Sequence, residues 1–204
     1  METTNFKKNQ VFTTRALVLC SMLSVISFVL MIFEAATGFF PPFLKIEISD
    51  VPAAIGTIAY GPLAGVVIEF IKNLLKLILR GTSTGGVGEL ANFVVGASYM
   101  IGLGLICSKK KTNSIKRVII GFVVATFSMA LLGALTNYFF MLPFYSKFMP
   151  MDQIIEMSSA TITSIKDKLT LVLYGITPFN IIKGVLISIL SYVLYNGLKK
   201  AIRF

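Results

Sequence analysis

The sequence predicts an all-α integral membrane protein, and three observations support this fold class. Hydrophobic residues make up 55% of the 204 residues and charged residues only 14%, whereas soluble domains carry about 25% charged residues. The mean hydropathy is +0.83. The apolar residues form runs of about 20, the length that crosses about 30 Å of hydrocarbon as a helix. We therefore expect one transmembrane domain over residues 1–204.

The first predicted helix covers residues 13–33. The polar segment before it is followed by no cleavage pattern of small residues, so we interpret it as a retained helix, not a signal peptide. Ala16, Cys20 and Ser24 recur every four residues and form a strip of small side chains. In lipid such a strip lets another helix approach closely. Two interpretations stay open, internal packing and contact with a partner protein.

The loop over residues 37–50 is unusually apolar. Pro41 and Pro42 prevent a helix there. The segment that follows alternates apolar and charged side chains, as expected for an extended segment with one apolar side: Leu44, Lys45, Ile46, Glu47 and Ile48. Such a loop either packs on the helices or covers a ligand, and both alternatives remain.

Residues 51–79 contain a break at Gly61 and Pro62, and the charges decide between one helix and two. A continuous helix would be about 43 Å long. The basic clusters are Lys7, Lys8 and Arg15, then Lys109, Lys110, Lys111, Lys116 and Arg117, and finally Lys199, Lys200 and Arg203. The positive-inside rule places all three clusters in the cytoplasm only if two helices form here. We therefore expect six transmembrane helices with both termini cytoplasmic, and Asp50 as the N-cap of the second.

The third predicted helix, which follows Pro62, carries a polar stripe. Its members share one helix face: Glu69, Lys72, Asn73, Lys76 and Arg80. A charge at the bilayer centre costs at least about 2.5 kcal/mol. We expect the stripe to face the other helices, with Glu69 pairing with Lys72 or Asn73 and Arg80 reaching outward.

A Gly/Ser/Thr loop over residues 81–88 connects this stripe to the fourth helix. That helix is expected to begin at Gly88 or Glu89 and to end near Cys107. The fifth covers residues 116–142, where Pro143 should stop it. The connection 143–168 is expected to include a short surface helix after Pro150. The sixth helix should begin with Thr177 as N-cap and Pro178 as its first residue, and should extend to residue 198.

Polar side chains from the last three predicted helices converge at one level of the outer third of the bilayer. These are Glu89, Asn92, Asn137, Asn180 and Lys183, and the aromatic residues beside them are Tyr138, Phe139, Phe140 and Phe179. Polar groups within a membrane span indicate a functional site. The pattern predicts a site for a small molecule that is flat and apolar at one end and polar at the other. The alternative is that these groups only link helices by hydrogen bonds.

The composition excludes several classes of function. The chain has no His, which removes imidazole metal ligands and Ser/His relays, and its two Cys residues offer no metal-binding spacing. The loop 81–88 lacks the Lys and Ser/Thr of a phosphate-binding Walker A motif. The net charge of +10 is explained by the positive-inside rule, not by nucleic acid. We expect neither an enzyme nor a bound metal or cofactor, and any energy source must be a partner.

At these residues the chain resembles the riboflavin-specific S component of energy-coupling factor (ECF) transporters. The segments that carry the resemblance are LKIEISDVP at 44–52, GPLAG at 61–65, Lys72-Asn73, GTSTGGVGELAN at 81–92, TNY at 136–138 and PFNIIKG at 178–184. The resemblance implies a multi-pass subunit of the bacterial cell membrane that captures riboflavin from outside under the loop 37–50. It also implies partners, a transmembrane coupling subunit and two cytoplasmic ATPases, and release of the vitamin inside after the subunit tilts.

The resemblance also implies roles for individual residues. The expected riboflavin-binding set is Leu44, Lys45, Ile46, Asp50, Glu89, Asn92, Asn137, Asn180 and Lys183. The first helix of the family commonly docks on the coupling subunit through Ala-x-x-x-Ala, and here Ala16, Cys20 and Ser24 take that place, with Cys20 as a departure. The alternatives are an S component for another vitamin, or an ion-coupled secondary transporter using Glu69 or Glu89. The latter usually needs two repeats of broken helices, and no convincing internal repeat is seen.

Overall fold

The computed structural model describes residues 13–82, 84–107 and 115–198, and its fold is all-helical apart from one short hairpin. The long helices are α1 (Thr14–Met31), α3 (Pro62–Arg80), α4 (Val87–Cys107), α5 (Ile115–Thr136) and α9 (Thr177–Leu198). The shorter helices are α2 (Asp50–Tyr60), α6 (Leu142–Tyr145), α7 (Met151–Ser159) and α8 (Lys168–Thr170). Two π-helical turns, η2 (Asn137–Met141) and η3 (Leu171–Ile176), join α5 to α6 and α8 to α9.

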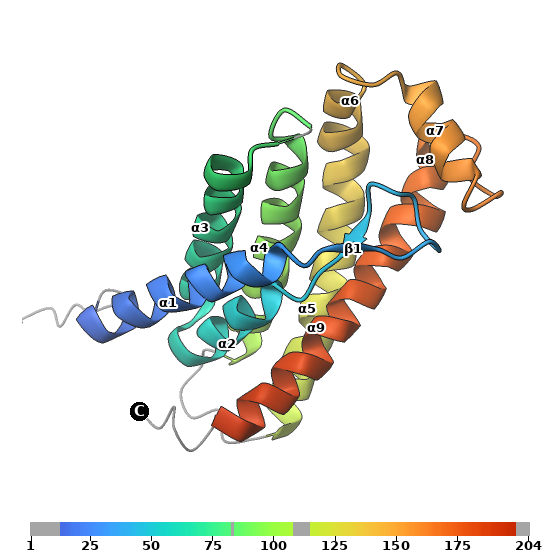
Figure 1. The fold of residues 1–204 in the computed structure, drawn as a ribbon. Coiled ribbons are helices and arrows are strands. Elements are labelled where there is room, and N and C mark those ends of the chain that lie inside the picture. The colour runs from blue at the N-terminus through green and yellow to red at the C-terminus, as the bar shows by residue number, and fades with distance from the viewer. Residues whose placement is uncertain (1–12, 83, 108–114, 199–204) are drawn as a thin grey trace, which may run out of the picture.

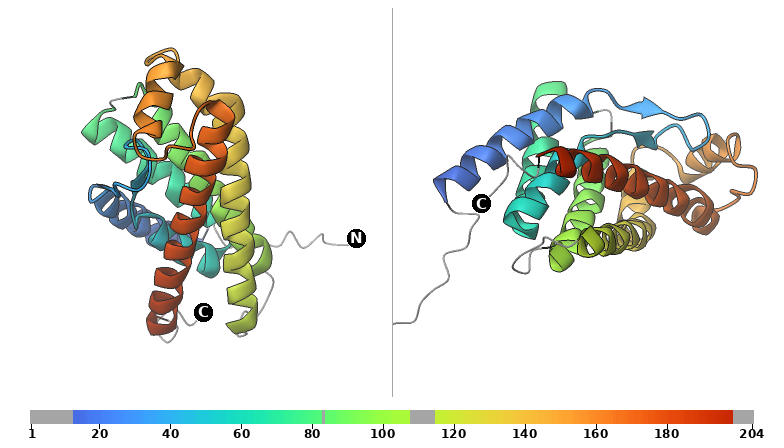
Figure 2. Two further views of the ribbon diagram at one scale, coloured as in Figure 1. Left: turned by 90° about the vertical axis from the view of Figure 1, so that its right-hand side faces the viewer. Right: turned by 90° about the horizontal axis from the view of Figure 1, so that it is seen from below.

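The helices α3, α4, α5 and α9 run along the height of the molecule, and α1 crosses them at one side (Figure 1). Figure 2 shows α5 and α9 side by side from a second direction. The main hydrophobic core lies where α2, α3, α4, α5 and α9 meet, around Tyr99, Met100, Leu103 and Ile187. The end of α4, the start of α5 and the end of α9 lie at the same end of the molecule (Figure 1). Most residues of the three basic clusters, Arg15, Lys116 and Arg117 excepted, lie outside the described residues.

The predicted break between the second and third helices is confirmed. Gly61 adopts a φ of 97°, a conformation that favours glycine. Pro62 then starts α3, where its missing N–H costs nothing because the first turn has no acceptor for it. The N-cap prediction was wrong in detail, since Ser49 is the N-cap and Asp50 is the first helical residue. Asp50 is instead turned inward to an ion pair.

Two predicted helix boundaries at prolines were wrong, and both corrections have the same physical reason. Pro143 does not stop the fifth helix, which continues through η2 into α6. Pro178 does not begin the sixth helix, which starts at Lys168 and runs through η3 into α9. A π-helical turn precedes each proline and shifts the hydrogen-bond register by one residue. This shift accommodates a ring that lacks an N–H donor and would clash with the previous turn.

The loop before α2 contains a small antiparallel hairpin. Its strands are β1 (Ala35–Ala36) and β2 (Lys45–Ile46), with Ala35 opposite Ile46 and Ala36 opposite Lys45. The hairpin partly confirms the predicted extended segment. The predicted surface helix after Pro150 is also confirmed, as α7.

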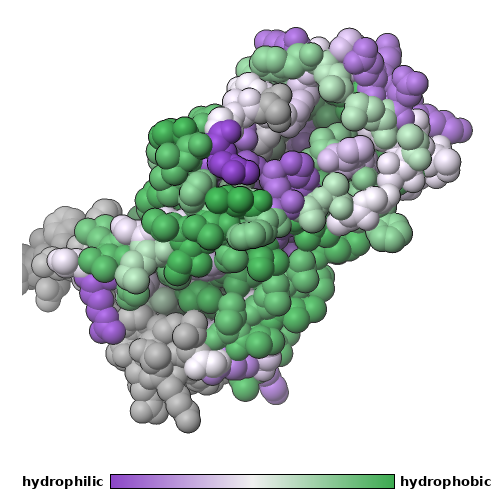
Figure 3. Space-filling model, in the orientation of Figure 1, coloured by the Kyte–Doolittle hydropathy of each residue, from purple (hydrophilic) through white to green (hydrophobic). Residues whose placement is uncertain are grey.

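Four of the described helical segments are long and apolar enough to cross a membrane: Thr14–Met31, Val87–Cys107, Ile115–Tyr145 and Lys168–Gly197. By length and composition, the described residues therefore contain fewer than the six transmembrane helices that we expected. With 11 residues, α2 is only about 16 Å long. Figure 3 shows apolar side chains over much of one face and polar side chains toward the end that carries α7.

Candidate ligand-binding site

The centre of the candidate site is Lys183 on α9, whose side chain is only 4% exposed. Its Nζ lies 3.0 Å from Asn92 Oδ1 on α4, 3.2 Å from Glu47 Oε1 and 3.1 Å from Asp50 Oδ2. Asn92 Nδ2 in turn donates to Glu47 Oε1 at 2.6 Å. Three of the predicted residues, Asn92, Asp50 and Lys183, are thus brought together by three separate helices.

A second buried lysine extends this cluster to α3. Lys72 Nζ forms ion pairs with Asp50 Oδ1 and, at 2.7 Å, with Glu69 Oε2, and it donates to Ser49 Oγ at 3.0 Å. Lys72, Asp50 and Glu69 are fully buried. The predicted pairing of Glu69 with Lys72 is confirmed, and Asp50 joins the two halves of the cluster.

Asn180 and Asn137 lie beside this cluster but make different contacts. Asn180 is buried one turn before Lys183, and its amide packs against Gly133 on α5. A β-carbon at Gly133 would lie 2.6 Å from Asn180 Nδ2. Asn137, one turn beyond Gly133, donates its Nδ2 to the Gly133 carbonyl at 2.8 Å. Glycine at position 133 therefore makes room for one amide and accepts a hydrogen bond from the other.

Glu89 lies at the start of α4 and contacts the loop before it. Thr82 Oγ1 donates to Glu89 Oε2 at 2.9 Å and also accepts hydrogen bonds from the N–H groups of Thr84 and Gly86. Glu89 thus orders the Gly/Ser/Thr loop. No ion pair between Glu89 and Lys183 is seen among the described residues.

The hairpin loop is fastened over α3 by Glu34. Its Oε1 lies 2.6 Å from Lys45 Nζ on β2, and its Oε2 lies 2.8 Å from Lys76 Nζ on α3. Lys45 is exposed, Ile46 is partly buried and Leu44 packs on the apolar cluster beneath α7. Of the three predicted hairpin residues, Lys45 is thus engaged by Glu34 and Leu44 by hydrophobic packing.

The aromatic residues near the site divide into two groups. Phe179 is buried and makes an edge-to-face contact with Phe40 of the loop, with ring centroids 5.5 Å apart. Phe139 and Phe140, predicted as neighbours of the polar groups, are 60% and 68% exposed and so lie on the surface. The π-helical turn that contains them rotates both rings to the outer surface.

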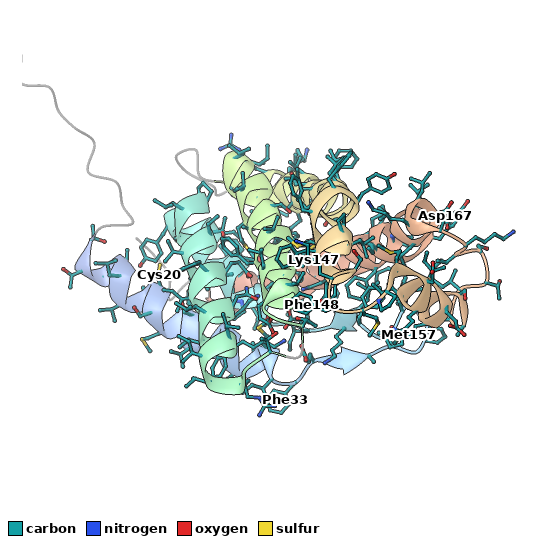
Figure 4. The ribbon with its side chains drawn as sticks, turned by 90° about the horizontal axis from the view of Figure 1, so that it is seen from above. Cys20, Phe33, Lys147, Phe148, Met157 and Asp167 are labelled. Atoms are coloured by element: carbon teal, nitrogen blue, oxygen red, sulfur yellow. The ribbon has the colours of Figure 1, made fainter. Side chains whose placement is uncertain are left out.

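The small-residue strip of α1 faces inward. Ala16, Cys20 and Ser24 are buried, and α1 packs on α2 and α3. Figure 4 shows Cys20 on the side of α1 toward α3. Of the two interpretations, internal packing describes this arrangement, and contact of the strip with a partner would require α1 to move.

Sequence reasoning missed Glu47 as a member of the site. It lies in the loop between β2 and α2, is 4% exposed, and contacts both Asn92 and Lys183. The alternating pattern of residues 44–48 could have predicted this role, because a carboxylate that is buried among apolar residues needs a cation as its partner. Ser49 and Glu34 were missed too, since their partners are distant in sequence.

Comparison with known proteins decides the family. Residues 15–195 match the family described as ECF transporter, substrate-specific component. The chain belongs to this family. As an S component it is a part of a transporter and a multi-pass membrane protein, which confirms the predictions of class and location and the prediction that it is not an enzyme.

Individual relatives match the S component over most of its length. It is 37% identical to the riboflavin transporter FmnP of Bacillus subtilis, over 91% of this chain and 92% of that protein. It is 36% identical to the riboflavin transporter RibU of Staphylococcus aureus, over 90% of each. A solved structure of the S component of a bacterial ECF transporter is 34% identical, with a TM-score of 0.71, covering 92% of this chain and 97% of that one. The S-component fold is thereby shown.

Proposed function

We propose that this S component binds riboflavin with high affinity for uptake across the bacterial cell membrane. The observation that carries the proposal is that relatives at 37% and 36% identity, matched over about nine tenths of both chains, are riboflavin transporters. The proposed riboflavin-binding residues are Leu44, Lys45, Ile46, Asp50, Glu89, Asn92, Asn137, Asn180 and Lys183.

The chemistry of the site supports the choice of ligand. The buried cluster around Lys183 supplies charged and amide groups, and Phe40 and Phe179 supply an apolar wall beside Asn180. Riboflavin has a flat aromatic ring system at one end and a hydroxylated chain at the other, and it carries both donors and acceptors. A site with one polar and one aromatic side suits such a molecule.

The proposal includes six helical segments in one domain, with both termini in the cytoplasm. The four apolar segments span the membrane. In this proposal α3 crosses as well, since its charged residues at positions 69 and 72 are buried and paired, and the shorter α2 lies within the bilayer. With both termini in the cytoplasm, the hairpin and α7 lie on the external side of the membrane in this proposal.

Energy for transport comes from partners in this proposal. They are a transmembrane coupling subunit and two ATPase subunits, as membership of the family implies. Docking through Ala16, Cys20 and Ser24 is part of the proposal, and it requires α1 to separate from α2 and α3, on which it packs.

The decisive experiment is to purify the full chain in detergent from cells supplied with riboflavin and to record its visible spectrum. We expect a yellow protein that carries one riboflavin per chain and releases it on denaturation. A colourless protein that also fails to bind added riboflavin, or one that prefers another vitamin, would overturn the proposal. Riboflavin uptake by vesicles that contain this chain alone, without ATPases, would favour a secondary transporter instead.

A further inference from the structure

The ammonium group of Lys183 is enclosed by protein oxygens, two of which accept its hydrogen bonds and a third of which forms an ion pair with it. An ammonium group carries three N–H donors. Three acceptors surround Lys183 Nζ, on Asn92, Asp50 and Glu47, at 3.0, 3.1 and 3.2 Å. A ligand carbonyl that approaches this lysine therefore competes with three protein oxygens.

The buried polar atoms near Lys183 that lack a hydrogen-bond partner are all acceptor oxygens. Among the described residues, Glu47 Oε2, Glu69 Oε1 and Asn73 Oδ1 are buried with neither a hydrogen-bond partner nor an ion pair, whereas Asp50 Oδ2 and Glu69 Oε2 lack a hydrogen bond but lie in ion pairs with Lys183 and Lys72. Each of these oxygens can accept a hydrogen bond and none can donate one while the carboxylates are charged. Because a buried polar atom without a partner is costly, the cluster is complementary to a molecule that brings donors.

The charges of the cluster point to the same kind of ligand. It contains three carboxylates, Glu47, Asp50 and Glu69, and two ammonium groups, Lys72 and Lys183, all of them buried. When all five are charged, one negative charge is in excess. Such a site favours N–H and O–H donors and disfavours ligands that are themselves anionic.

We infer that the ligand is recognised through its own hydrogen-bond donors, and that Glu47 Oε2 is the acceptor that receives one of them. This inference rests on the proposed function and deepens it. Glu47 then becomes a ligand-binding residue. Lys183 and Asn92 act on the ligand in part through Glu47, because both hold its Oε1 and so fix the direction of Oε2.

The surroundings select Glu47 over the other two free acceptors. Glu69 is 0% exposed and presses against α4, where a β-carbon at Gly96 would lie 2.5 Å from Glu69 Oε2. Asn73 is on the next turn of α3, with its Nδ2 already bonded to the Glu69 carbonyl at 2.8 Å. Glu47 instead lies on the loop that leads from the hairpin into α2. A loop can adjust to a ligand, whereas packed helices hold their positions.

Riboflavin offers two kinds of donor for this oxygen, the imide N–H of its ring and the hydroxyl groups of its side chain. Both can be removed by chemistry on the ligand. An analogue methylated at the imide nitrogen lacks the first, and lumiflavin, which has a methyl group in place of the ribityl chain, lacks the second. Comparing them on the wild type and on Glu47→Gln gives a double-mutant cycle between protein and ligand.

The experiment titrates riboflavin and both analogues against the full-length protein in detergent. The variant Glu47→Gln keeps the size of the side chain and leaves two carboxylates with two ammonium groups, so the fold should be retained. Glu156→Gln, at an exposed position on α7, is the matched control. The ratio of two Kd values on one protein sample does not depend on the fraction of that sample that is folded.

We expect Glu47→Gln to raise the riboflavin Kd at least about tenfold, equal to about 1.4 kcal/mol. We also expect one analogue to lose much of its disadvantage on Glu47→Gln, because the Gln oxygen keeps the bonds of Oε1 and an amide N–H, which cannot accept, then replaces Oε2. Glu156→Gln should behave as the wild type does. The inference would be overturned if, for each analogue, the ratio of its Kd to that of riboflavin were the same on Glu47→Gln as on the wild type. Tighter riboflavin binding by Glu47→Gln would overturn it too. Either result would leave the proposed function intact. A wild type that binds no riboflavin would overturn the proposed function, and this inference with it.

Discussion

Lys183 on α9 donates a hydrogen bond to Asn92 on α4 across a distance of 3.0 Å, although the two residues are 91 positions apart in the sequence. This contact joins two of the polar groups that the sequence predicted to converge. It also shows how they are held, since Glu47 contacts both. The predictions below test this arrangement and the packing around it.

Replacing Lys183 should damage both binding and folding. Lys183→Met removes the cation paired with Glu47 and one of the two cations paired with Asp50, and breaking a buried ion pair costs about 3–5 kcal/mol. We expect a lower unfolding temperature and a riboflavin Kd at least about a hundredfold higher, equal to about 2.8 kcal/mol. Thermal unfolding and flavin titration measure the two effects. The control is Lys147→Met, just after α6 (Figure 4), whose ammonium group lies over the Phe144 ring and forms no ion pair with another described residue. Wild-type affinity in Lys183→Met would remove Lys183 from the site.

Enlarging Gly133 should disturb Asn180. In Gly133→Ala the new β-carbon would lie 2.6 Å from Asn180 Nδ2, so the amide must shift. We expect a loss of about 1–3 kcal/mol in stability from overpacking and a riboflavin Kd raised about tenfold, as measured by flavin titration. Gly197→Ala serves as the control, since among the described residues no atom outside its own stretch of helix lies within 4 Å of the added carbon. Unchanged affinity in Gly133→Ala would show that the position of Asn180 does not matter for the ligand.

The fastening of the hairpin by Glu34 should depend on pH. Burial raises the pKa of Glu34, but the hydrogen bonds and charges of Lys45 and Lys76 outweigh this effect and lower it. A carboxyl group with a lowered pKa contributes stability above its unfolded pKa, and the contribution disappears as pH falls through the folded pKa. The difference in unfolding free energy between wild type and Glu34→Gln should be about 0.2–1 kcal/mol at neutral pH, as for partly exposed pairs. It should shrink in acid. A difference that grows as the pH falls would contradict this account.

The close approach of α4 to the start of α3 should depend on Gly104. A β-carbon there would lie 2.4 Å from Pro62 Cβ and 2.7 Å from Pro62 Cα, and backbone atoms cannot rotate away. We expect Gly104→Ala to lose about 1–3 kcal/mol of stability, seen as a lower unfolding temperature. The folded fraction should still bind riboflavin, because Asn92 is 12 residues away along α4, or about 18 Å. Unfolding at the wild-type temperature would show that α3 and α4 can separate without cost.

Much of the secondary structure was predictable because it depends on short-range rules. The break at Gly61 follows from a positive φ that glycine tolerates, and the pairing of Glu69 with Lys72 follows from their spacing on one helix face. The errors at Pro143 and Pro178 have the opposite origin. A proline ends a regular α-helix, but a preceding π-helical turn removes the conflict. No local rule in these segments predicts that turn.

The sequence alone determined the class of this protein, its polar stripe and the convergence of Asn92 with Lys183. These features depend on the apolar length needed to cross lipid and on the cost of placing a charge there, both of which are properties of the chain itself. Only the tertiary structure decided that Glu47 binds Lys183 and Asn92, that the strip of Ala16 faces inward, and that Phe139 and Phe140 face outward. The physical reason is that a buried charge requires a partner but does not specify which one. The packing of distant helices makes that choice.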